Sequence, residues 1–239
     1  MAPLRLSQLL SDSAALLRAR PAASFSLSLA VVTSLLSVCC VLGLFTTPWF
    51  MCELFAVQLG VALSRPVPRT LSWIPAGGVM LGAVLLVSTV AWLTLLGVPE
   101  PNHGSPLPRS LGASALLRNA GFYAALASAL SVLAILPWLY APLLLIERKA
   151  RFDHALLESA RLVVSRGLFS HVRLSLASHA LQVAPPALAA LLALFVEPSQ
   201  LPLWALASAP LLCVTVPLGQ GMIVSAYARV REAAPPSPS

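Results

Sequence analysis

The chain has 239 residues, of which 58% are hydrophobic and 10% are charged, whereas ordinary globular domains have about 45–50% and about 25%. This composition excludes a typical soluble domain and also a disordered chain, which combines low hydrophobicity with high charge. The formal net charge is +7, but the cations lie between apolar blocks and form no basic patch interleaved with aromatic residues. Nucleic-acid binding is therefore not indicated, and the class that remains is an integral membrane protein.

An amphipathic helix is predicted in the first segment of the chain, residues 1–20. Its leucines recur at helical spacing among polar residues: Leu6, Leu9, Leu10, Leu16 and Leu17. We expect this helix to lie in the interface of the membrane.

Membrane-spanning helices are predicted next, because a spanning helix needs about 20 mostly apolar residues. Six blocks qualify: 25–45, 46–63, 73–98, 121–146, 172–196 and 201–226. The block 46–63 is marginal, since its 18 positions reach only about 27 Å. Thr47 as a cap and Pro48 in the first turn predict where it begins.

The placement of the cations decides whether that marginal block crosses the membrane, because short cytoplasmic loops carry an excess of Lys and Arg. Six spans with the N-terminus inside leave only Arg109 and Arg118 outside among the 15 cations. A five-span arrangement leaves five cations outside. The sequence therefore predicts six spans with both termini cytoplasmic.

A second amphipathic helix is predicted between the fourth and fifth spans, in residues 150–166. Its apolar stripe, which is expected to face lipid, consists of Phe152, Leu156, Ala160 and Val163. Arginines such as Arg161 are expected to face anionic headgroups. Just before it, Glu147 and Arg151 stand four residues apart, which favours a weak helical ion pair.

Two segments rich in proline are predicted to lack regular structure. One is the loop 99–119, which we expect outside the membrane. The other is the tail 229–239.

Glu53 is the most informative polar residue within a predicted span, because a carboxylate there is costly and is often functional. A polar stripe on the fifth span consists of His171, Ser175, Ser178, His179 and Gln182. One interpretation is a polar cavity used in transport. The other is that these side chains mark packing faces and hydrogen-bond between helices.

Gly78 and Gly82 have the spacing that favours close helix contact in membranes. Prolines within the last three spans predict kinks: Pro137, Pro142, Pro185, Pro186, Pro210 and Pro217.

Enzyme signatures are missing from the sequence: it contains no phosphate-binding loop, no His-Glu-x-x-His and no Gly-x-Ser-x-Gly. The cysteines lie inside apolar blocks and indicate neither disulfides nor a metal site. We therefore expect no catalytic residue, no metal and no cofactor.

The segment Tyr140–Glu147 (YAPLLLIE), followed by Ala155–Val163 (ALLESARLV), carries a recognisable pattern. It resembles prokaryotic six-helix integral membrane proteins that are related to the membrane domain of glycerophosphodiester phosphodiesterases. In that group a span that ends near a proline leads to an amphipathic helix with an Ala-Leu-x-x-Ser core. Pro48 and Trp49 after the first span also suit that layout. The resemblance implies a six-helix membrane fold and carries over no catalytic residue.

These observations predict an all-α, polytopic membrane helix bundle with interfacial amphipathic helices. The arginine bias and the abundance of alanine, leucine and proline suggest the cytoplasmic membrane of a GC-rich bacterium. The function expected is that of a non-enzymatic accessory or scaffold protein, whose partners are the lipid bilayer and a membrane or envelope protein. The alternative is a small-solute or ion permease that uses Glu53 and the polar stripe of the fifth span.

Overall fold

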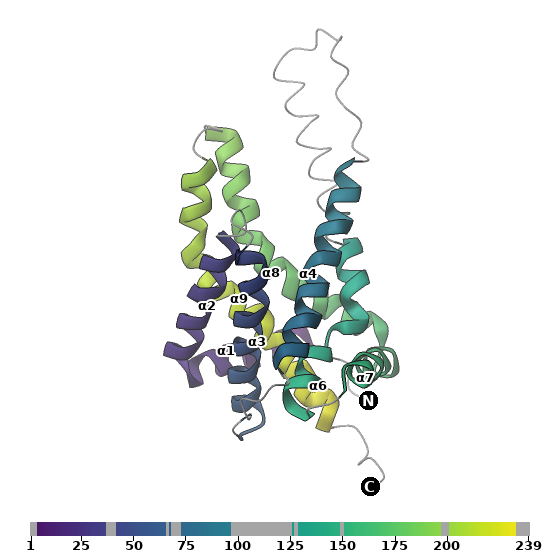
Figure 1. Cartoon of the computed structure of the whole chain (residues 1–239). Helices are drawn as coiled ribbons and strands as arrows, with labels where there is room; N and C mark the ends of the chain where they lie inside the picture. The colour runs from purple at the N-terminus through teal and green to yellow at the C-terminus, as the bar shows by residue number, and fades with distance from the viewer. Residues whose placement is uncertain are drawn as a thin grey trace. The chain divides into compact units, whose positions relative to one another are not determined.

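The computed structural model describes residues 4–36, 42–65, 67, 73–96, 126, 129–148, 151–196 and 201–232. These residues form helices and turns, with no β-strand among them, so the predicted all-α class is confirmed for the part of the chain described. The helices are α1 (Leu6–Ala19), α2 (Pro21–Leu36), α3 (Leu42–Ala62), α4 (Trp73–Leu96), the 3₁₀ turn η2 (Leu136–Trp138), α6 (Ala141–Arg148), α7 (Phe152–Ser165), α8 (Leu168–Val196) and α9 (Leu201–Glu232) (Figure 1).

The chain divides into two compact units. The larger unit comprises Met1–Leu81 and Leu136–Ser239, and the smaller comprises Gly82–Ile135. The described part of the smaller unit consists of the second half of α4, residue 126 and helical residues 129–135. All of the side-chain contacts discussed below belong to the larger unit.

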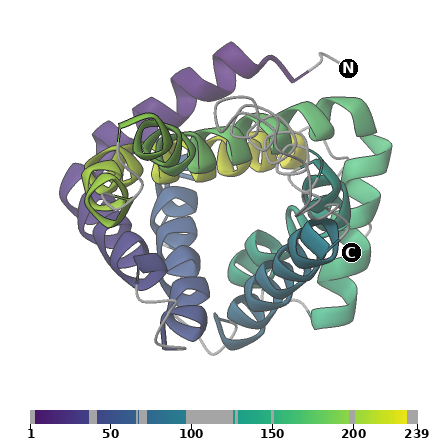
Figure 2. The same cartoon turned by 90° about the horizontal axis from the view of Figure 1, so that it is seen from above.

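Helix α9 is the element around which the larger unit is organised. It has 32 residues and packs against α8, α1, α2 and α3. Pro210 and Pro217 lie inside it. The predicted N-terminal amphipathic helix corresponds to α1, which runs alongside α9 (Figure 2) and buries Leu9, Ser13 and Leu16.

The N-terminal part of α3 differs from its prediction. The helix begins at Leu42, so Pro48 lies inside it and not in its first turn. Thr47 is buried within the helix and does not stand at the predicted N-cap. Thr46 instead donates a hydrogen bond from its hydroxyl to Ser34 Oγ at 3.1 Å, which joins α3 to α2.

Helical geometry changes at Pro137, within the predicted fourth span. Residues 129–135 are helical, η2 follows, and α6 resumes at Ala141. At the end of this break the backbone N–H of Tyr140 donates to Ser159 Oγ at 3.0 Å, which satisfies a buried donor with a side chain of α7.

Two helical segments among the described residues are long and apolar enough to cross a membrane, Ala129–Arg148 and Leu206–Glu232. A third is obtained if α1 and α2, which meet at an angle of 103°, are taken together as one bent span.

The distribution of side chains supports a membrane environment. Large apolar residues are exposed on the outer faces of α2, α8 and α9: Phe25, Leu29, Leu176, Val183, Leu188, Leu203, Leu206, Leu211 and Val214. Polar residues such as Gln58, Ser175 and Gln220 are buried. Soluble monomers rarely expose such extensive apolar surface, whereas lipid solvates it and leaves small and polar residues to the helix interfaces.

The prediction of a disordered tail from residue 229 onward was wrong for its first four residues. Helix α9 continues to Glu232, and Arg229 Nη2 forms an ion pair at 2.6 Å with Asp12 of α1. The remainder of the tail and the predicted loop 99–119 lie outside the described residues.

Candidate functional site

Side chains of three helices donate hydrogen bonds to consecutive backbone carbonyls of α9. We call this segment, Pro217–Gly221, the crossing point. Gln58 of α3 donates to the Pro217 carbonyl at 2.8 Å. Ser13 of α1 donates to the Leu218 carbonyl at 2.7 Å. Ser178 of α8 donates to the Gly219 carbonyl at 2.9 Å. One short stretch of backbone thus hydrogen-bonds to α1, α3 and α8.

Glycines make this close approach sterically feasible. A Cβ on Gly219 would lie 2.9 Å from the Ser178 backbone oxygen and 3.1 Å from Gln182 Nε2. A Cβ on Gly221 would lie 3.1 Å from Ser13 Cβ and even closer to its hydroxyl. Any other residue at either position would therefore push a neighbouring helix away from α9.

The predicted polar stripe on α8 lies partly in this packed interface. His171, Ser175 and Ser178 are buried, while His179 and Gln182 are half-buried. Gln182 Nε2 donates to Ser178 Oγ at 3.4 Å, next to the bond from Ser178 to α9. For these two residues, the observed contacts are those of a helix-packing face.

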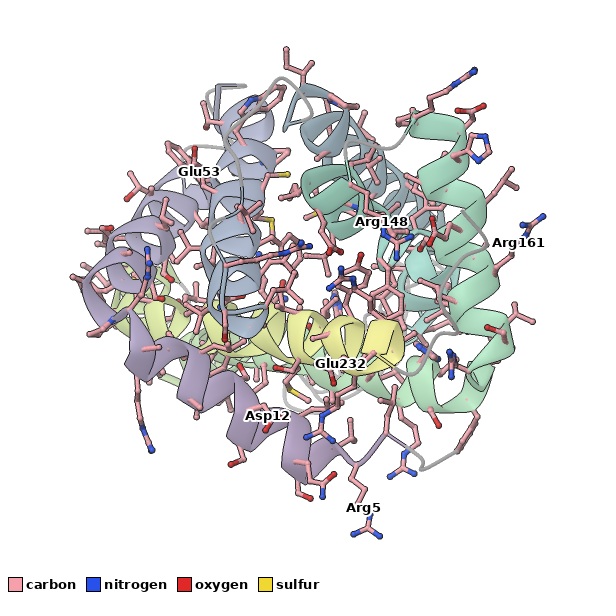
Figure 3. All side chains as sticks on the ribbon, turned by 90° about the horizontal axis from the view of Figure 1, so that it is seen from below. Arg5, Asp12, Glu53, Arg148, Arg161 and Glu232 are labelled. Atoms are coloured by element: carbon pink, nitrogen blue, oxygen red, sulfur yellow. The ribbon has the colours of Figure 1, made fainter. Side chains whose placement is uncertain are left out.

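Glu53 lies on α3 and is half-buried; it is labelled in Figure 3. Helix α3 packs mainly against α2 and α9, and α8 packs mainly against α9. The structure therefore does not bring the helix that carries Glu53 broadly against the helix that carries the polar stripe.

The glycines predicted to pack helices together lie on α4. Gly78 is exposed, and a Cβ there would meet nothing within 4 Å. Gly82 is half-buried. Close packing on this helix occurs at the neighbouring Gly77, where a Cβ would lie 3.3 Å from the ring of Trp49.

A second polar site, which we call the charged cluster, consists of Glu147, Arg65, Arg231 and Tyr227. The Glu147 side chain is only 2% exposed. Its Oε1 accepts from Arg65 and, at 2.8 Å, from Arg231 Nη2. Its Oε2 accepts from the Tyr227 hydroxyl at 2.5 Å. The cluster joins the end of α3, the end of α6 and the end of α9.

The turn after α3 fixes the position of Arg65. The N–H of Arg65 donates to the Gly60 carbonyl and the N–H of Ser64 to the Val61 carbonyl, both at 3.1 Å. Ser64 has a positive φ of 51°. These bonds and this φ define a Schellman motif, which closes a helix C-terminus in one geometry. Arg65 is therefore directed by backbone structure as well as by its ion pair.

The weak pair predicted between Glu147 and Arg151 was wrong. Helix α6 ends at Arg148 and α7 begins at Phe152, so the two residues do not share a helix and four-residue spacing has no meaning there. Arg151 instead lies 3.4 Å from Asp153. The Asp153 side chain is 60% exposed in the first turn of α7, and the backbone N–H of His154 and then Arg151 lower the pKa of its carboxyl.

Further ion pairs surround the charged cluster. Arg148 Nη1 lies 2.5 Å from Glu158 of α7. Arg229 contacts both Asp12 and Gln8 of α1. Figure 3, a view onto this side, shows Asp12 on α1 beside α9, and Arg161 pointing away from α7.

Several buried polar atoms have no hydrogen-bond partner within the described structure. Tyr140 and His171 pack edge to face with ring centroids 5.5 Å apart, and neither the Tyr140 hydroxyl nor His171 Nε2 is bonded. His171 Nδ1 lies 2.9 Å from the Gly167 carbonyl, which can only accept, so Nδ1 carries the proton. Both side-chain amide atoms of Gln220 are also unbonded.

The apolar side chains that are exposed on α7 differ from the stripe that was predicted to face lipid. Val163 is buried together with Ala155 and Ser159, because the bond from Tyr140 to Ser159 turns this face toward the protein. Leu156 is half-buried against the core, whereas Phe152 and Arg161 are exposed. Besides Phe152, the large apolar side chains exposed on α7 are Leu157 and Val164, and Leu168 and Phe169 are exposed at the start of α8.

Comparison of the chain with protein-family models, with curated proteins and with solved structures finds no match. Inferences about function therefore rest on the geometry of the two sites. The described residues contain no group of three His, Cys, Asp or Glu side chains that could hold a metal ion.

The charged cluster was missed by sequence reasoning, although one signal pointed to it. Tyr227 and Arg231 stand four residues apart, so they share a face at the end of a long apolar helix. Glu147 likewise ends an apolar block. Residues at the same ends of predicted spans are expected at the same depth in the membrane. A carboxylate and cations at those ends could therefore have been predicted to pair.

Proposed function

We propose that this chain is a six-span protein of the bacterial cytoplasmic membrane with both termini in the cytoplasm. It acts as a non-enzymatic accessory or scaffold protein that engages lipid headgroups, or an envelope partner, through its cytoplasmic side. The resemblance in layout to six-helix prokaryotic membrane proteins agrees with this proposal.

The observation that carries the proposal is the common location of the charged helix ends. Within the larger unit, α1, α7 and the ends of α3, α6 and α9 lie on the same side (Figure 1). The charged cluster and the pairs Arg148–Glu158 and Arg229–Asp12 join these elements. Because cytoplasmic loops carry the excess of Arg, this side is assigned to the cytoplasm, next to the anionic headgroups that arginines attract.

Single cysteines test the topology. In a background without the four native cysteines, Ser105→Cys is expected to react with an impermeant maleimide on intact cells. Ser237→Cys is expected to react only after the membrane is permeabilised. Labelling of Ser237→Cys on intact cells, at the rate seen for Ser105→Cys, contradicts the proposed orientation.

The second candidate is a small-solute or ion permease. It is favoured by the buried polar atoms of Tyr140, His171 and Gln220 that have no hydrogen-bond partner among the described residues. Buried polar groups are usually satisfied by protein or by ordered water, and a polar path through the bundle would supply that water. Its test is a pair of variants at Glu53. If Glu53 is a structural hydrogen-bonding residue, Glu53→Leu melts well below Glu53→Gln in the same detergent. Equal melting of the two variants favours the permease.

A further inference from the structure

The two arginines of the charged cluster are held side by side by one atom. Arg65 and Arg231 both donate to Glu147 Oε1, and the Tyr227 hydroxyl occupies Oε2. Two guanidinium groups that share one oxygen carry like charges and repel each other. The buried carboxylate of Glu147 and the turn after α3 keep them together.

Both arginines retain unused donors. A guanidinium has five N–H donors in a planar fork, and among the described residues the one polar contact of each guanidinium group is with Glu147 Oε1. The Arg65 side chain is 52% exposed and that of Arg231 is 31% exposed. Their remaining donors are therefore available to a molecule outside the protein.

The charge of the arrangement matches one class of ligand. Two arginines and one glutamate leave a charge of +1, and paired guanidinium groups bind the oxygens of phosphate in a bidentate manner. A phosphodiester carries a single negative charge, which balances the remaining +1.

The depth of the arrangement indicates where the phosphate comes from. Among the described residues, the two apolar segments long enough to cross a membrane end at Arg148 and at Glu232, each one residue after a member of the charged cluster. The end of a span lies at the level of the lipid headgroups.

Resting on the cytoplasmic orientation proposed above, we infer that Arg65 and Arg231 form a specific site for the phosphate of an anionic phospholipid. Glu147 and Tyr227 are positioning residues for it, because their contacts hold the two guanidinium groups and leave the exposed donors free.

The test compares the full-length protein in detergent with two variants of equal net charge. The triple variant Arg65→Gln, Arg231→Gln, Glu147→Gln removes the site without leaving an unpaired carboxylate. The control Arg161→Gln changes the net charge by the same amount at an exposed arginine of α7 outside the charged cluster, so it measures the part of lipid binding that is due to net charge alone. The readouts are the rise in melting temperature with phosphatidylglycerol or phosphatidylcholine, and the lipid copies retained in native mass spectrometry.

The wild type and Arg161→Gln are expected to be stabilised by phosphatidylglycerol and not by phosphatidylcholine. The triple variant is expected to need at least about tenfold more phosphatidylglycerol for the same rise in melting temperature, since each charge-assisted hydrogen bond contributes about a factor of ten in affinity. Equal responses of the triple variant and Arg161→Gln overturn the site and leave general lipid engagement in place. No preference for phosphatidylglycerol in the wild type overturns the lipid engagement proposed above as well.

Two further arms complete the experiment. Inorganic phosphate, at matched ionic strength, is expected to stabilise the wild type little; full stabilisation by phosphate alone overturns the assignment to lipid. If the triple variant does not fold, Arg65→Lys with Arg231→Lys retains the charge and loses the planar fork. That double variant is expected to bind phosphatidylglycerol more weakly than the wild type, and unchanged binding overturns the site.

Discussion

The crossing point on α9 and the charged cluster at its C-terminal end connect distant parts of the chain in different ways. At the crossing point, neutral side chains of Gln58, Ser13 and Ser178 donate to backbone carbonyls, and glycines bring the helices together. In the charged cluster, ionised side chains bind one another and much of each arginine remains exposed.

This difference follows from the cost of burying charge. In an apolar interior an ion pair loses more hydration than it recovers unless its geometry is excellent. Hydroxyl and amide groups cost far less, and they gain a partner in a helix carbonyl. In the charged cluster the arginine side chains are 52% and 31% exposed, so water still reaches them and a carboxylate is tolerated there. The comparison predicts that substitutions act through charge at one site and through volume at the other.

The largest effect is expected when the charged cluster loses both cations. Arg65→Gln with Arg231→Gln leaves Glu147 buried with only the Tyr227 hydroxyl, and breaking a buried pair in this way costs about 3–5 kcal/mol. Adding Glu147→Gln is expected to restore most of that loss. Chemical unfolding of the wild type, the double variant and the triple variant in one detergent measures these changes in the free energy of unfolding. A triple variant no more stable than the double variant would show that the charge on Glu147 is not the cause.

Only part of this comparison was accessible from sequence. Helical periodicity predicted α1 and α7, because that signal repeats within a turn or two. The charged cluster joins residues 82 and 80 positions apart, and no local pattern encodes such a pairing. The buried side of α7 was misjudged for the same reason, since the bond from Tyr140 to Ser159 depends on a break that lies 19 positions away.

Glycines in the predicted spans show the same limit. Gly78 and Gly82 have the spacing associated with helix packing, but close approach occurs at Gly219 and Gly221. The sequence shows where a helix is able to come close to another helix. Which of those positions faces a neighbour is decided by the tertiary arrangement.

The next largest effect is expected at the crossing point, from added volume. Gly219→Ala places a Cβ 2.9 Å from the Ser178 backbone oxygen, so α8 must shift, and overpacking of this kind costs about 1–3 kcal/mol. The matched control is Gly78→Ala, where the Cβ meets nothing and the helix gains up to about 1 kcal/mol in propensity. Opposite signs of the change in melting temperature are the expected result. A Gly219→Ala protein as stable as Gly78→Ala contradicts close packing of α8 on α9.

Two buried tyrosines provide a smaller and sharper contrast. Tyr227→Phe removes the donor to Glu147 Oε2, a hydrogen bond to a charged group worth about 1.5–3 kcal/mol. Tyr140→Phe removes a buried hydroxyl that has no partner among the described residues. It is therefore expected to leave stability unchanged or to raise it by about 1 kcal/mol. Thermal unfolding of both variants compares them. Equal destabilisation by the two substitutions would show that the Tyr140 hydroxyl binds water or solute inside the bundle.

The smallest effect is expected at the exposed edge of the charged side, at Asp153. Its pKa is lowered from the ordinary value of 3.8 by the backbone N–H of His154 and then by Arg151. A carboxyl whose pKa is lower in the folded state stabilises the fold above its unfolded pKa, and this contribution disappears as the pH falls through the folded pKa. Asp153→Asn is therefore expected to melt slightly below the wild type at pH 7. The difference is expected to shrink as the pH falls below about 3.8 and to vanish only below the lowered folded pKa. Because the side chain is largely exposed, solvent and salt screen the interaction, and 0.5 M salt is expected to reduce the part due to Arg151. Melting curves of the wild type and the variant between pH 3 and pH 7 test this.

A difference that grows as the pH falls would have the wrong sign for a lowered pKa. A difference as large as that of Tyr227→Phe would show that Asp153 is more buried in the membrane-bound protein than the exposed start of α7 indicates.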